Sequence, residues 1–306
     1  MSVKISVLTP SYNRCDLLKR TLETLLAQDF PKDQYEVIVV DDGSTDGTLS
    51  MAQELAKTAS CRMKVLTKKN DGASRARNLG IHAAEGEILL FIDDDTFAVP
   101  ALLREHLAFH ELYPKAVVQG WVNHIEELNP KGPRKVKMDD LSRSFFWTSN
   151  VSVRKKYVDE VGGFYDGFQE YGYQDMELGF RLKQLGLKKY VNNKAIVSHY
   201  KPPKQKQDLP RMLQQAESNA RSGMIYVRKY GGAWRPRMHT GITGFRMGLD
   251  LLLRPLKPLF QSAFDNAPEG PMGSWTSFCA RMLCSYRFFD TVRKGDTNRP
   301  GPEDTP

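Results

Sequence analysis

Short apolar runs alternate with amphipathic stretches along about the first 200 residues of this chain. The runs are rich in valine and isoleucine and have the length of buried strands, whereas leucines recur at helical spacing between them. The sequence therefore predicts strands at residues 4–8, 36–40, 64–67, 88–92 and 117–125, and helices at 16–28, 48–57, 74–84 and 101–113. This alternating order predicts an α/β fold with a doubly wound, mostly parallel sheet and helices on both faces.

The pattern changes near residue 203, where the sequence becomes more basic and amphipathic. We expect an α/β domain over residues 1–203 and a helical C-terminal region over 204–292. The remaining residues, 293–306, are polar and rich in proline, which predicts a disordered tail. Within the first region, Asn129–Lys135 combines prolines, a glycine and basic residues, which predicts a mobile basic loop.

Large apolar and basic residues are mixed within residues 245–264 of the helical region. Because Pro255 and Pro258 interrupt the pattern, the sequence predicts a short helix followed by an extended apolar finger. Such a segment fits an inter-domain core or an oligomer contact. It also fits a peripheral membrane contact, with the apolar side toward lipid and the cations toward anionic headgroups. The sequence leaves these alternatives, and the oligomeric state, open.

Composition limits the class of protein. The chain has 306 residues, 41% apolar and 26% charged, which is enough for one large domain or two with ordinary cores. No apolar run approaches roughly 18 residues, the N-terminus lacks signal-peptide features, and the four cysteines form no zinc set. We therefore expect a cytoplasmic protein, at the cytoplasmic face of a membrane if residues 245–264 bind lipid. The net charge of +8 favours anionic partners, but scattered basic residues and the lack of a recognised module argue against nucleic acid.

The acidic triplet Asp93-Asp94-Asp95 directly follows the apolar run at 88–92. In open α/β sheets, ligands bind beyond the carboxyl ends of the strands. Three adjacent carboxylates repel one another there unless a cation offsets them. Their oxygens suit Mg²⁺ or Mn²⁺, especially when a substrate phosphate completes the coordination shell. The alternative interpretation of the triplet alone is a solvated acidic turn.

Two other strand ends carry groups that suit a nucleotide. After the first strand, Tyr12 offers an aromatic face for a base, although packing at a strand–helix corner explains it equally well alone. After the second strand, Asp41 and Asp42 can accept hydrogen bonds from a ring N–H or from ribose hydroxyls. Because Gly43 and Ser44 follow the two aspartates, an alternative interpretation of this segment is a turn that leads into a helix cap.

Arg75 and Arg77 lie in the first turn of the helix predicted at 74–84. Helix N-termini and guanidinium groups both favour phosphate oxygens. The alternative is a solvated basic face. The chain has no Gly-x-Gly-x-x-Gly after a strand and no Gly-Lys-Ser/Thr loop, which argues against a nicotinamide dehydrogenase and a P-loop ATPase.

Together these segments resemble the family 2 glycosyltransferases of the GT-A fold. The matching motifs, in the family's order and spacing, are Thr9-Pro10-Ser11-Tyr12-Asn13, Asp41-Asp42-Gly43-Ser44, Arg75-Ala76-Arg77-Asn78 and Asp93-Asp94-Asp95. The resemblance implies a donor site that comprises Thr9, Pro10, Tyr12, Asp41, Asp42, Arg75, Arg77, Asn78, Asp93 and Asp94. In that site Tyr12 would stack on the donor base, Asp42 would bind the polar edge of the base, and the two arginines would lie near the diphosphate.

The same resemblance implies a divalent cation, Mn²⁺ or Mg²⁺, as cofactor. Asp93 and Asp95 would form the family's Asp-x-Asp motif, with Asp95 as the direct metal ligand and Asp93 or Asp94 facing the ribose. His199 follows the strand-like residues 195–198, where family members often have a metal-binding histidine. Imidazole is an adequate Mn²⁺ ligand beside carboxylates. Without the resemblance, a lone histidine at a strand end is usually a hydrogen-bonded surface residue.

The resemblance also extends to an acceptor side. The segments at 147–154 and 161–166 look like the family's acceptor-side sequence, which implies that Trp147 and Asn150 lie there together with Glu170.

The general base implied by the family is Asp175. The family commonly has Glu-Asp where this chain has Gln174-Asp175, so the base is kept while its neighbour is neutral. This departure removes one like charge from beside Asp175 and puts in doubt any role of the preceding glutamate. Glu170 and Glu177 are candidates for a second carboxylate. Without the resemblance, Asp175 is simply an acid favoured at a helix N-terminus.

We therefore expect an inverting, metal-dependent glycosyltransferase, and a hexosyltransferase in particular. Its donor would be a nucleotide-diphosphate sugar, with a UDP-sugar favoured, and its acceptor a hydroxyl of a glycan, a polysaccharide precursor or a lipid-linked sugar. Inversion is implied by the family alone. Two alternatives stay open: a nucleotidyltransferase, which would release pyrophosphate, and a noncatalytic nucleotide-sugar-binding module. The signature of such a module would be loss of the base or metal acids, and neither Asp95 nor Asp175 is lost.

Overall fold

The structure, a computed structural model, describes residues 2–128, 144–168 and 170–295. It divides into two compact units. The α/β unit comprises Met1–Asp166 and Asp175–Pro202, and the helical unit comprises Gly167–Gln174 and the chain from Pro203. The loop expected to be mobile, Asn129–Lys135, and residues 296–306 of the expected tail lie outside the described residues.

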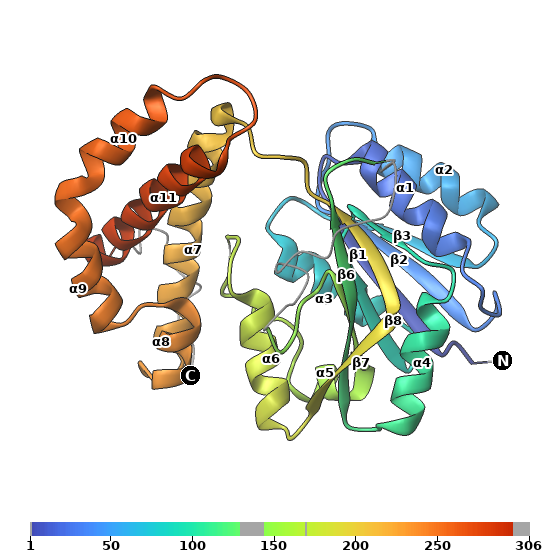
Figure 1. Cartoon of the computed structure of the whole chain (residues 1–306). Helices are drawn as coiled ribbons and strands as arrows, with labels where there is room; N and C mark the ends of the chain where they lie inside the picture. Colours follow the sequence, from blue (N-terminus) through green and yellow to red (C-terminus); the bar gives the residue numbers. More distant parts are fainter. Residues whose placement is uncertain (1, 129–143, 169, 296–306) are drawn as a thin grey trace. The chain divides into compact units, whose positions relative to one another are not determined.

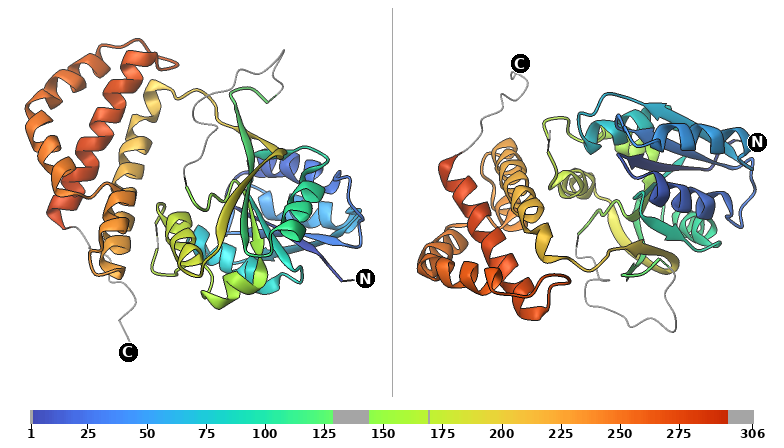
Figure 2. Two further views of the ribbon diagram at one scale, coloured as in Figure 1. Left: turned by 60° about the horizontal axis from the view of Figure 1, so that its bottom comes forward. Right: turned by 90° about the horizontal axis from the view of Figure 1, so that it is seen from above.

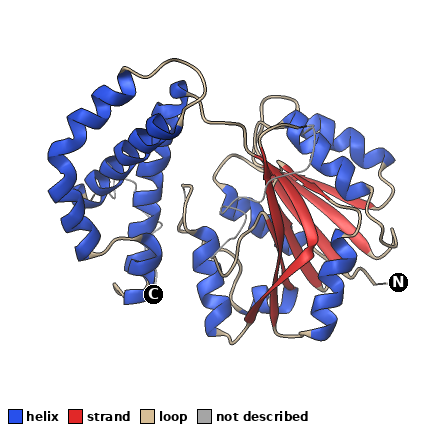
Figure 3. Cartoon of the chain, viewed as in Figure 1, coloured by secondary structure: helices blue, strands red, loops and turns tan. Residues whose placement is uncertain are grey.

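One sheet of eight strands forms the centre of the α/β unit (Figures 1 and 3). Its strands stand in the order β3-β2-β1-β4-β7-β6-β8-β5. Their bounds are β1 (Ile5–Ser11), β2 (Tyr35–Asp41), β3 (Arg62–Thr67), β4 (Ile88–Ile92), β5 (Thr96–Ala98), β6 (Ala116–Ile125), β7 (Asn150–Arg154) and β8 (Lys188–Tyr200). Strands β3, β2, β1 and β4 are parallel, and β6 is parallel to β8, whereas β7 and β5 are antiparallel to their neighbours. The expected mostly parallel sheet is confirmed.

Helices cover both faces of this sheet. Helices α1 (Cys15–Leu26), α2 (Thr48–Thr58) and α4 (Leu102–Leu112) contribute to the core on one face, and α3 (Ala73–Ala83), α5 (Lys155–Glu160) and α6 (Gln174–Gln184) to the core on the other. Successive residues of β2 alternate between the two cores, with Val37 and Val39 in the first and Ile38 and Val40 in the second. Because side chains alternate along a strand, this continuous apolar run is buried on both sides, as expected for a doubly wound sheet.

The topology assembles polar groups at one edge of the sheet. The carboxyl ends of the parallel strands β1, β2 and β4 meet there. Antiparallel β7 begins at the same edge, since Asn150 pairs with Ile92 at the end of β4. Near the carboxyl end of β8, His199 pairs with Thr96 at the start of β5. Residues far apart in sequence therefore come together at this edge, next to the end of β4 and Asp93.

The helical unit is built from α7 (Leu209–Lys229), α8 (Trp234–Thr240), α9 (Gly244–Leu253), α10 (Lys257–Asp265) and α11 (Ser274–Lys294) (Figure 2). Short 3₁₀ segments, η2 (Lys206–Asp208) and η3 (Arg254–Leu256), precede α7 and α10. Leu209, Phe264 and Leu283 join α7, α10 and α11 in one apolar core. Among the described residues, no helix is both long and apolar enough to cross a membrane.

Two expectations for this region were wrong in detail. The extended apolar finger is helical, because Pro255 and Pro258 occupy the first turns of η3 and α10. Proline is tolerated there, since the first turn of a helix leaves its N–H groups without intrahelical partners. Helix α11 also includes Arg293 and Lys294, which the sequence assigned to the tail.

Candidate active site

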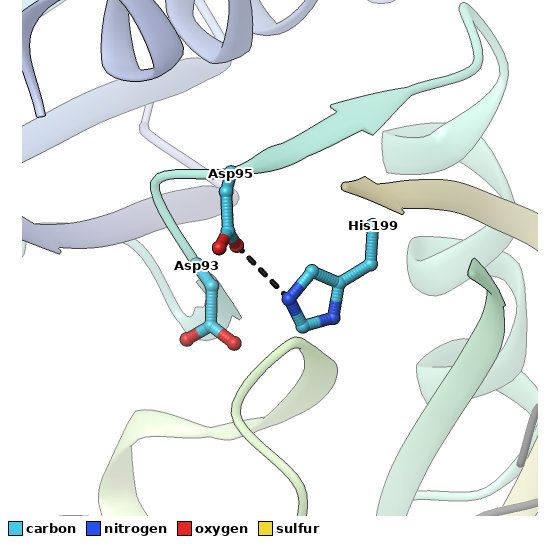
Figure 4. A group of neighbouring side chains, drawn as sticks. All are labelled: Asp93, Asp95 and His199. Atoms are coloured by element: carbon cyan, nitrogen blue, oxygen red, sulfur yellow. Dashed lines mark ion pairs between the residues drawn. The ribbon is translucent and has the colours of Figure 1, made fainter. Parts of the chain in front are cut away.

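A set of side chains that could hold a metal ion lies at this edge of the sheet (Figure 4). Asp93 and Asp95 come from the turn between β4 and β5, and His199 comes from β8. Each offers one ligand atom, and these atoms lie within 4.8 Å of one another. The Nε2 atom of His199 is 3.1 Å from Oδ1 of Asp95. Two carboxylates and one imidazole form a donor set that suits Mn²⁺ or Mg²⁺ with additional oxygen ligands from a substrate.

The electrostatics of the triplet also fit a cation. Burial raises the pKa of Asp94 to about 7, against the attraction of Arg14, and the neighbouring carboxylates add to the rise. Burial opposes ionisation of Asp95 as well, but hydrogen bonding and charge from His199 and Arg14 outweigh it and lower the pKa of Asp95. The triplet is thus a partly buried cluster of carboxylates, whose negative charge a divalent cation would offset.

A chain of polar contacts leads from Asp93 to Asp175. The hydroxyl of Ser149 donates a short hydrogen bond to Asp93, and Nη2 of Arg77 lies 3.6 Å from Oδ1 of Asp93. The same Arg77 nitrogen donates to the hydroxyl of Thr148 at 3.0 Å. That hydroxyl donates to Oδ2 of Asp175 at 2.9 Å, and the Thr148 backbone N–H points to the same oxygen at 3.2 Å.

Asp175 lies in the first turn of α6 and is partly exposed. Burial raises the pKa of its carboxyl, whereas Arg77 and the Thr148 hydrogen bonds act in the opposite direction. Thr148 holds one carboxylate oxygen, Oδ2, through both its hydroxyl and its backbone N–H. A carboxylate with a raised pKa that is oriented through one oxygen is suited to accept a proton through the other.

Gln174 closes the turn that precedes Asp175. Its Oε1 atom accepts from the Gly172 N–H at 2.9 Å, and its side-chain NH₂ donates to the Glu170 carbonyl. A glutamate at this position could accept the first bond but could not donate the second. The neutral residue found where the resembling family commonly has glutamate therefore has a structural function in this chain.

The two aspartates after β2 are engaged with nearby protein groups. Asp41 is buried and accepts hydrogen bonds from the backbone of Gly43 and from Thr67. Asp42 is also buried, and its Oδ1 atom is 2.6 Å from Nζ of Lys68. Its Oδ2 atom accepts from the Gly72 N–H at 3.2 Å, at the start of α3.

The remaining donor-side candidates differ in exposure. Tyr12 is 45% exposed, which leaves its ring accessible to a base, and Pro10 is partly exposed. Thr9 is fully buried, and its hydroxyl has no hydrogen-bond partner among the described residues. Arg75 pairs with Asp71 at 3.2 Å.

Asn78 serves mainly to hold the chain. Its amide nitrogen donates to the Phe164 carbonyl at 2.7 Å, and its amide oxygen accepts from the Phe164 N–H at 2.8 Å. Gly163 passes so close to Asn78, with a φ of +71°, that a β-carbon would lie 2.7 Å from the amide oxygen. These contacts attach the segment before Asp166 to α3.

The acceptor-side candidates belong to two different units of the chain. Trp147 stacks on His124 with ring centroids 5.9 Å apart. Asn150 is fully buried and donates to the Ala195 carbonyl at 2.9 Å, so its side chain supports the sheet. Glu170 belongs to the helical unit, where Arg221 pairs with it at 2.8 Å. Glu177, the other candidate for a second carboxylate, is buried and paired with Arg181 at 2.6 Å.

Four residues of the site were not identified from the sequence. Thr148 and Ser149 contact Asp175 and Asp93, Arg14 lies 2.6 Å from Oδ2 of Asp95, and Ser11 donates to Asp94 at 2.7 Å. Ser11 lies within a motif that the sequence singled out, so its position at the end of β1 was an available signal. Thr148 and Ser149 lie within the segment at 147–154 that the sequence singled out for the acceptor side, but their contacts with Asp175 and Asp93 depend on the antiparallel pairing of β7, which brings the N-terminal end of that strand to this edge.

Comparisons with known proteins agree with the fold and the motifs. The family described as Glycosyl transferase family 2 matches residues 6–166. Validoxylamine A glucosyltransferase of Streptomyces hygroscopicus subsp. jinggangensis is 31% identical over 229 residues, which cover 62% of this chain and 54% of that protein. The chain spans 66% or less of the length of such curated relatives.

Solved structures share the fold at low identity. A mannosyltransferase from Pyrobaculum calidifontis, in complex with GDP-Man and Mn²⁺, has a TM-score of 0.63 and 15% identity, over 97% of this chain and 87% of that chain. S. aureus TarS 1-349, in complex with UDP-GlcNAc, has a TM-score of 0.56 and 20% identity, over 98% of each chain. Because the family match covers more than half of the sequence, and the fold agrees with it, this chain belongs to glycosyl transferase family 2 and has the GT-A fold.

Proposed function

We propose that this protein is an inverting, metal-dependent hexosyltransferase that moves a sugar from a nucleotide-diphosphate donor to a hydroxyl acceptor. The proposal rests on one arrangement, in which the set Asp93, Asp95 and His199 is connected through Arg77 and Thr148 to Asp175. Glycosyl transfer needs positive charge near a departing diphosphate and a base near an attacking hydroxyl. The arrangement supplies candidates for both.

Asp175 is the proposed general base. Its carboxylate takes the proton of the acceptor hydroxyl while that oxygen forms a bond to the anomeric carbon, and the bond from this carbon to the diphosphate oxygen breaks. Attack from the face opposite the leaving group inverts the anomeric centre. Thr148 orients the base through one of its oxygens.

Asp93, Asp95 and His199 are the proposed holders of Mn²⁺ or Mg²⁺. Such a cation would stabilise the negative charge that develops on the departing nucleoside diphosphate. Arg77 adds a preorganised positive charge between this set and Asp175, and Arg75 is the second arginine proposed for the diphosphate.

Tyr12 and Asp42 are the proposed partners of the donor base. The relatives bind nucleotide-activated hexoses of more than one kind, GDP-Man in one solved structure and UDP-GlcNAc in another. We favour a UDP-sugar. The proposed acceptor is a glycan, a polysaccharide precursor or a lipid-linked sugar, and polysaccharide biosynthesis is the corresponding process.

The test begins with donor binding. UDP-, GDP- and dTDP-sugars are screened with and without Mn²⁺ by thermal shift, because a ligand that binds the native state raises its unfolding temperature. The stabilising donor is then incubated with the protein, and released nucleotide is identified by chromatography. We expect nucleoside diphosphate, formed slowly by transfer to water when no acceptor is added.

Two variants test whether release of the nucleotide depends on Asp175. Asp175→Asn keeps the shape of the side chain but cannot accept the proton, so release should fall by roughly two to four orders of magnitude while donor binding persists. The control Asp159→Asn changes a partly exposed carboxylate on α5 that pairs with Lys155, and it should leave release unchanged. Release of pyrophosphate would instead identify a nucleotidyltransferase, and binding without any release would identify a noncatalytic module.

A further inference from the structure

The positive charge of the chain is concentrated in its C-terminal part. Residues 203–295 contain 15 lysines and arginines and six aspartates and glutamates, a net formal charge of +9. Residues 1–202 contain 28 and 27 of these residues, a net charge of +1. The proposed nucleotide site therefore does not account for the basicity of the protein. A partner of the helical unit that carries negative charge would account for it.

Helix α9 presents large apolar side chains to solvent. Phe245, Leu249 and Leu252 follow one another at spacings of four and three residues, which places them on one face of the helix. They are 80%, 43% and 75% exposed. Leu256 in η3 and Leu259 in α10 are exposed as well, at 40% and 65%. We call these five residues the apolar stripe.

Exposed apolar residues grouped in this way are uncommon on a protein surface that binds nothing. Helices α9 and α10 already pack on α11, where Phe260 and Phe264 contribute to the buried side. The apolar stripe is additional to that core and contributes nothing to it.

The acidic groups that adjoin the apolar stripe are paired with arginines, whereas the exposed Asp265 stands at the C-terminal end of α10. Asp250 is the only acidic residue between Gly244 and Phe264, and it is 5% exposed. Its carboxylate is paired with Arg293 at 2.8 Å. Asp290 of α11 is likewise paired with Arg293, at 3.0 Å, and with Arg254. The exposed charges along α9 and the start of α10, such as Arg246 and Lys257, are positive.

An aromatic pair adjoins α10. Trp275 and Phe278, in the first turns of α11, are 60% and 38% exposed and stack with ring centroids 5.5 Å apart. Phe278 also contacts Phe260 of α10, at 5.8 Å between centroids. Aromatic side chains, tryptophan above all, favour the boundary between lipid headgroups and acyl chains.

We propose that the apolar stripe docks on the surface of a bilayer that contains anionic lipids. The leucines and Phe245 enter the acyl boundary, while neighbouring arginines and lysines bind headgroup phosphates. A second copy of the chain fits less well, because it would bring two surfaces of the same positive charge together. The proposal is independent of the catalytic assignment, because it uses no residue of the α/β unit.

The experiment is flotation of the full chain with vesicles. Vesicles of phosphatidylcholine alone are compared with vesicles that also contain phosphatidylglycerol, each at low and at high salt. We expect the protein to float with the anionic vesicles at low salt, to float less at high salt, and to stay unbound with phosphatidylcholine alone. A wild-type protein that stays unbound to anionic vesicles at low salt overturns the proposal.

Matched variants distinguish vesicle binding through the apolar stripe from binding through the positive charge of the chain alone. The double variant F245S/L252S should reduce the vesicle-bound fraction at least tenfold, and its fold should persist because both side chains are largely exposed. The control L112S/V191S changes two side chains of the α/β unit that are 70% and 54% exposed, and it should bind as the wild type does. Equal flotation of F245S/L252S and wild type would contradict the proposal. Dimers in analytical ultracentrifugation that dissociate in F245S/L252S, without flotation of the wild type, would assign the apolar stripe to a second copy.

Discussion

Arg14 partly compensates the acidic triplet within the protein itself. Its Nη1 atom is 2.6 Å from Oδ2 of Asp95 and 3.7 Å from Oδ1 of Asp94. Because Arg14 occupies Oδ2, the Oδ1 atom of Asp95 faces His199 and remains the oxygen best placed for a cation. Arg14, together with Arg77, which lies 3.6 Å from Asp93, offsets part of the negative charge of the triplet, and a divalent ion would add to this compensation.

The first prediction concerns this charge. Asp95→Asn removes one proposed ligand charge while it keeps the size of the side chain. We expect Mn²⁺ to lose its effect on donor affinity, which isothermal titration calorimetry with and without Mn²⁺ measures. His199→Asn should weaken the same effect. The control His124→Asn changes a histidine whose ring lies 5.4 Å from that of His199 but which is outside the proposed ligand set. Unchanged metal dependence in Asp95→Asn would refute the assignment.

The second prediction concerns the residue that orients the base. Thr148→Val removes the hydroxyl that joins Arg77 to Asp175 but keeps the backbone N–H bond. Because that hydrogen bond favours the ionised carboxyl, its loss should raise the pKa of Asp175 further above its usual range. The base must be ionised, so activity is lost as pH falls through this pKa, and the acid limb of the kcat profile should move to higher pH.

We expect kcat of Thr148→Val to fall about tenfold at neutral pH, with little change in donor affinity. The matched change Thr58→Val affects a helix-end threonine whose hydroxyl bonds the local backbone only, and it should leave the profile in place. An acid limb at the wild-type position would show that Thr148 does not act through Asp175.

Only some residues of the candidate site could be recognised from the local sequence. Asp93 and Asp95 follow a strand that could be recognised, and the structure brings His199 to them from more than 100 positions away. The resemblance supplied His199, since nothing local distinguishes it. Asn150 illustrates the opposite case, because a polar side chain at a strand end can as well be turned inward to bond backbone carbonyls. The roles of the donor and base residues stay predictions.

At the scale of elements, the segment before α6 stands out. Gly167–Gln174 groups with the helical unit, although Asp175, the next residue, belongs to the α/β unit. Within the helical unit, Ser218 donates to the Tyr171 carbonyl at 2.8 Å and Tyr173 donates to the Thr240 carbonyl at 3.2 Å. Tyr173 has a φ of +62°, a conformation that costs a non-glycine residue free energy unless its surroundings hold it. The helices therefore maintain a strained turn directly before the proposed base.

The third prediction tests this attachment. Arg221 donates from Nε and Nη2 to Glu170, at 2.9 and 2.8 Å to Oε2. Arg221→Gln should loosen the turn and reduce kcat about tenfold without changing donor affinity, because small displacements of a reacting group are costly. Arg221→Lys should restore only part of the loss, since lysine lacks the planar fork. Steady-state kinetics and donor titration measure the two effects separately.

A control variant distinguishes positioning from general stability. Arg287→Gln removes another ion pair of the helical unit, with Glu217 at 2.8 Å, from a half-exposed position on α11. It should lower the unfolding temperature and leave kcat unchanged. Equal loss of kcat in both variants would argue that stability of the helices, and not the position of the turn, limits the rate.

Element positions were easier to predict than strand directions. The strand at 88–92 was predicted with its observed bounds, because a continuous apolar run between polar residues marks both ends. The antiparallel directions of β5 and β7 could not be predicted from the sequence. The direction of a strand depends on the path of the connection that leads to it, and the local sequence pattern does not encode that path. Prolines in the helical unit were misread because their effect depends on whether they stand in a first turn.

For the whole molecule, we expect acid stability to depend on a buried polar cluster between α4 and the sheet. His106 bonds the Ser152 hydroxyl at 2.8 Å and the Asn150 amide oxygen at 2.9 Å, and His110 bonds the same hydroxyl at 2.8 Å. Burial lowers the pKa of His106 to about 4 and that of His110 to about 3, and the charge of nearby Arg154 adds to the second shift. Both rings are therefore neutral in the folded protein at physiological pH.

The last prediction follows from the difference between the pKa values of these histidines in the folded and the unfolded protein. Unfolded histidine binds a proton below a pH of about 6.5, whereas the folded protein resists protonation of these rings down to much lower pH. Between these values the unfolded state binds more protons, so the free energy of unfolding falls as pH decreases, by about 1.4 kcal/mol per pH unit for each histidine. Urea unfolding at pH 7.5 and 5.5 measures the fall. His110→Gln should reduce it by about 1.4 kcal/mol, because glutamine does not titrate. If His110→Gln retains the full wild-type pH dependence, the acid sensitivity of this protein originates in its carboxylates and not in the cluster beneath α4.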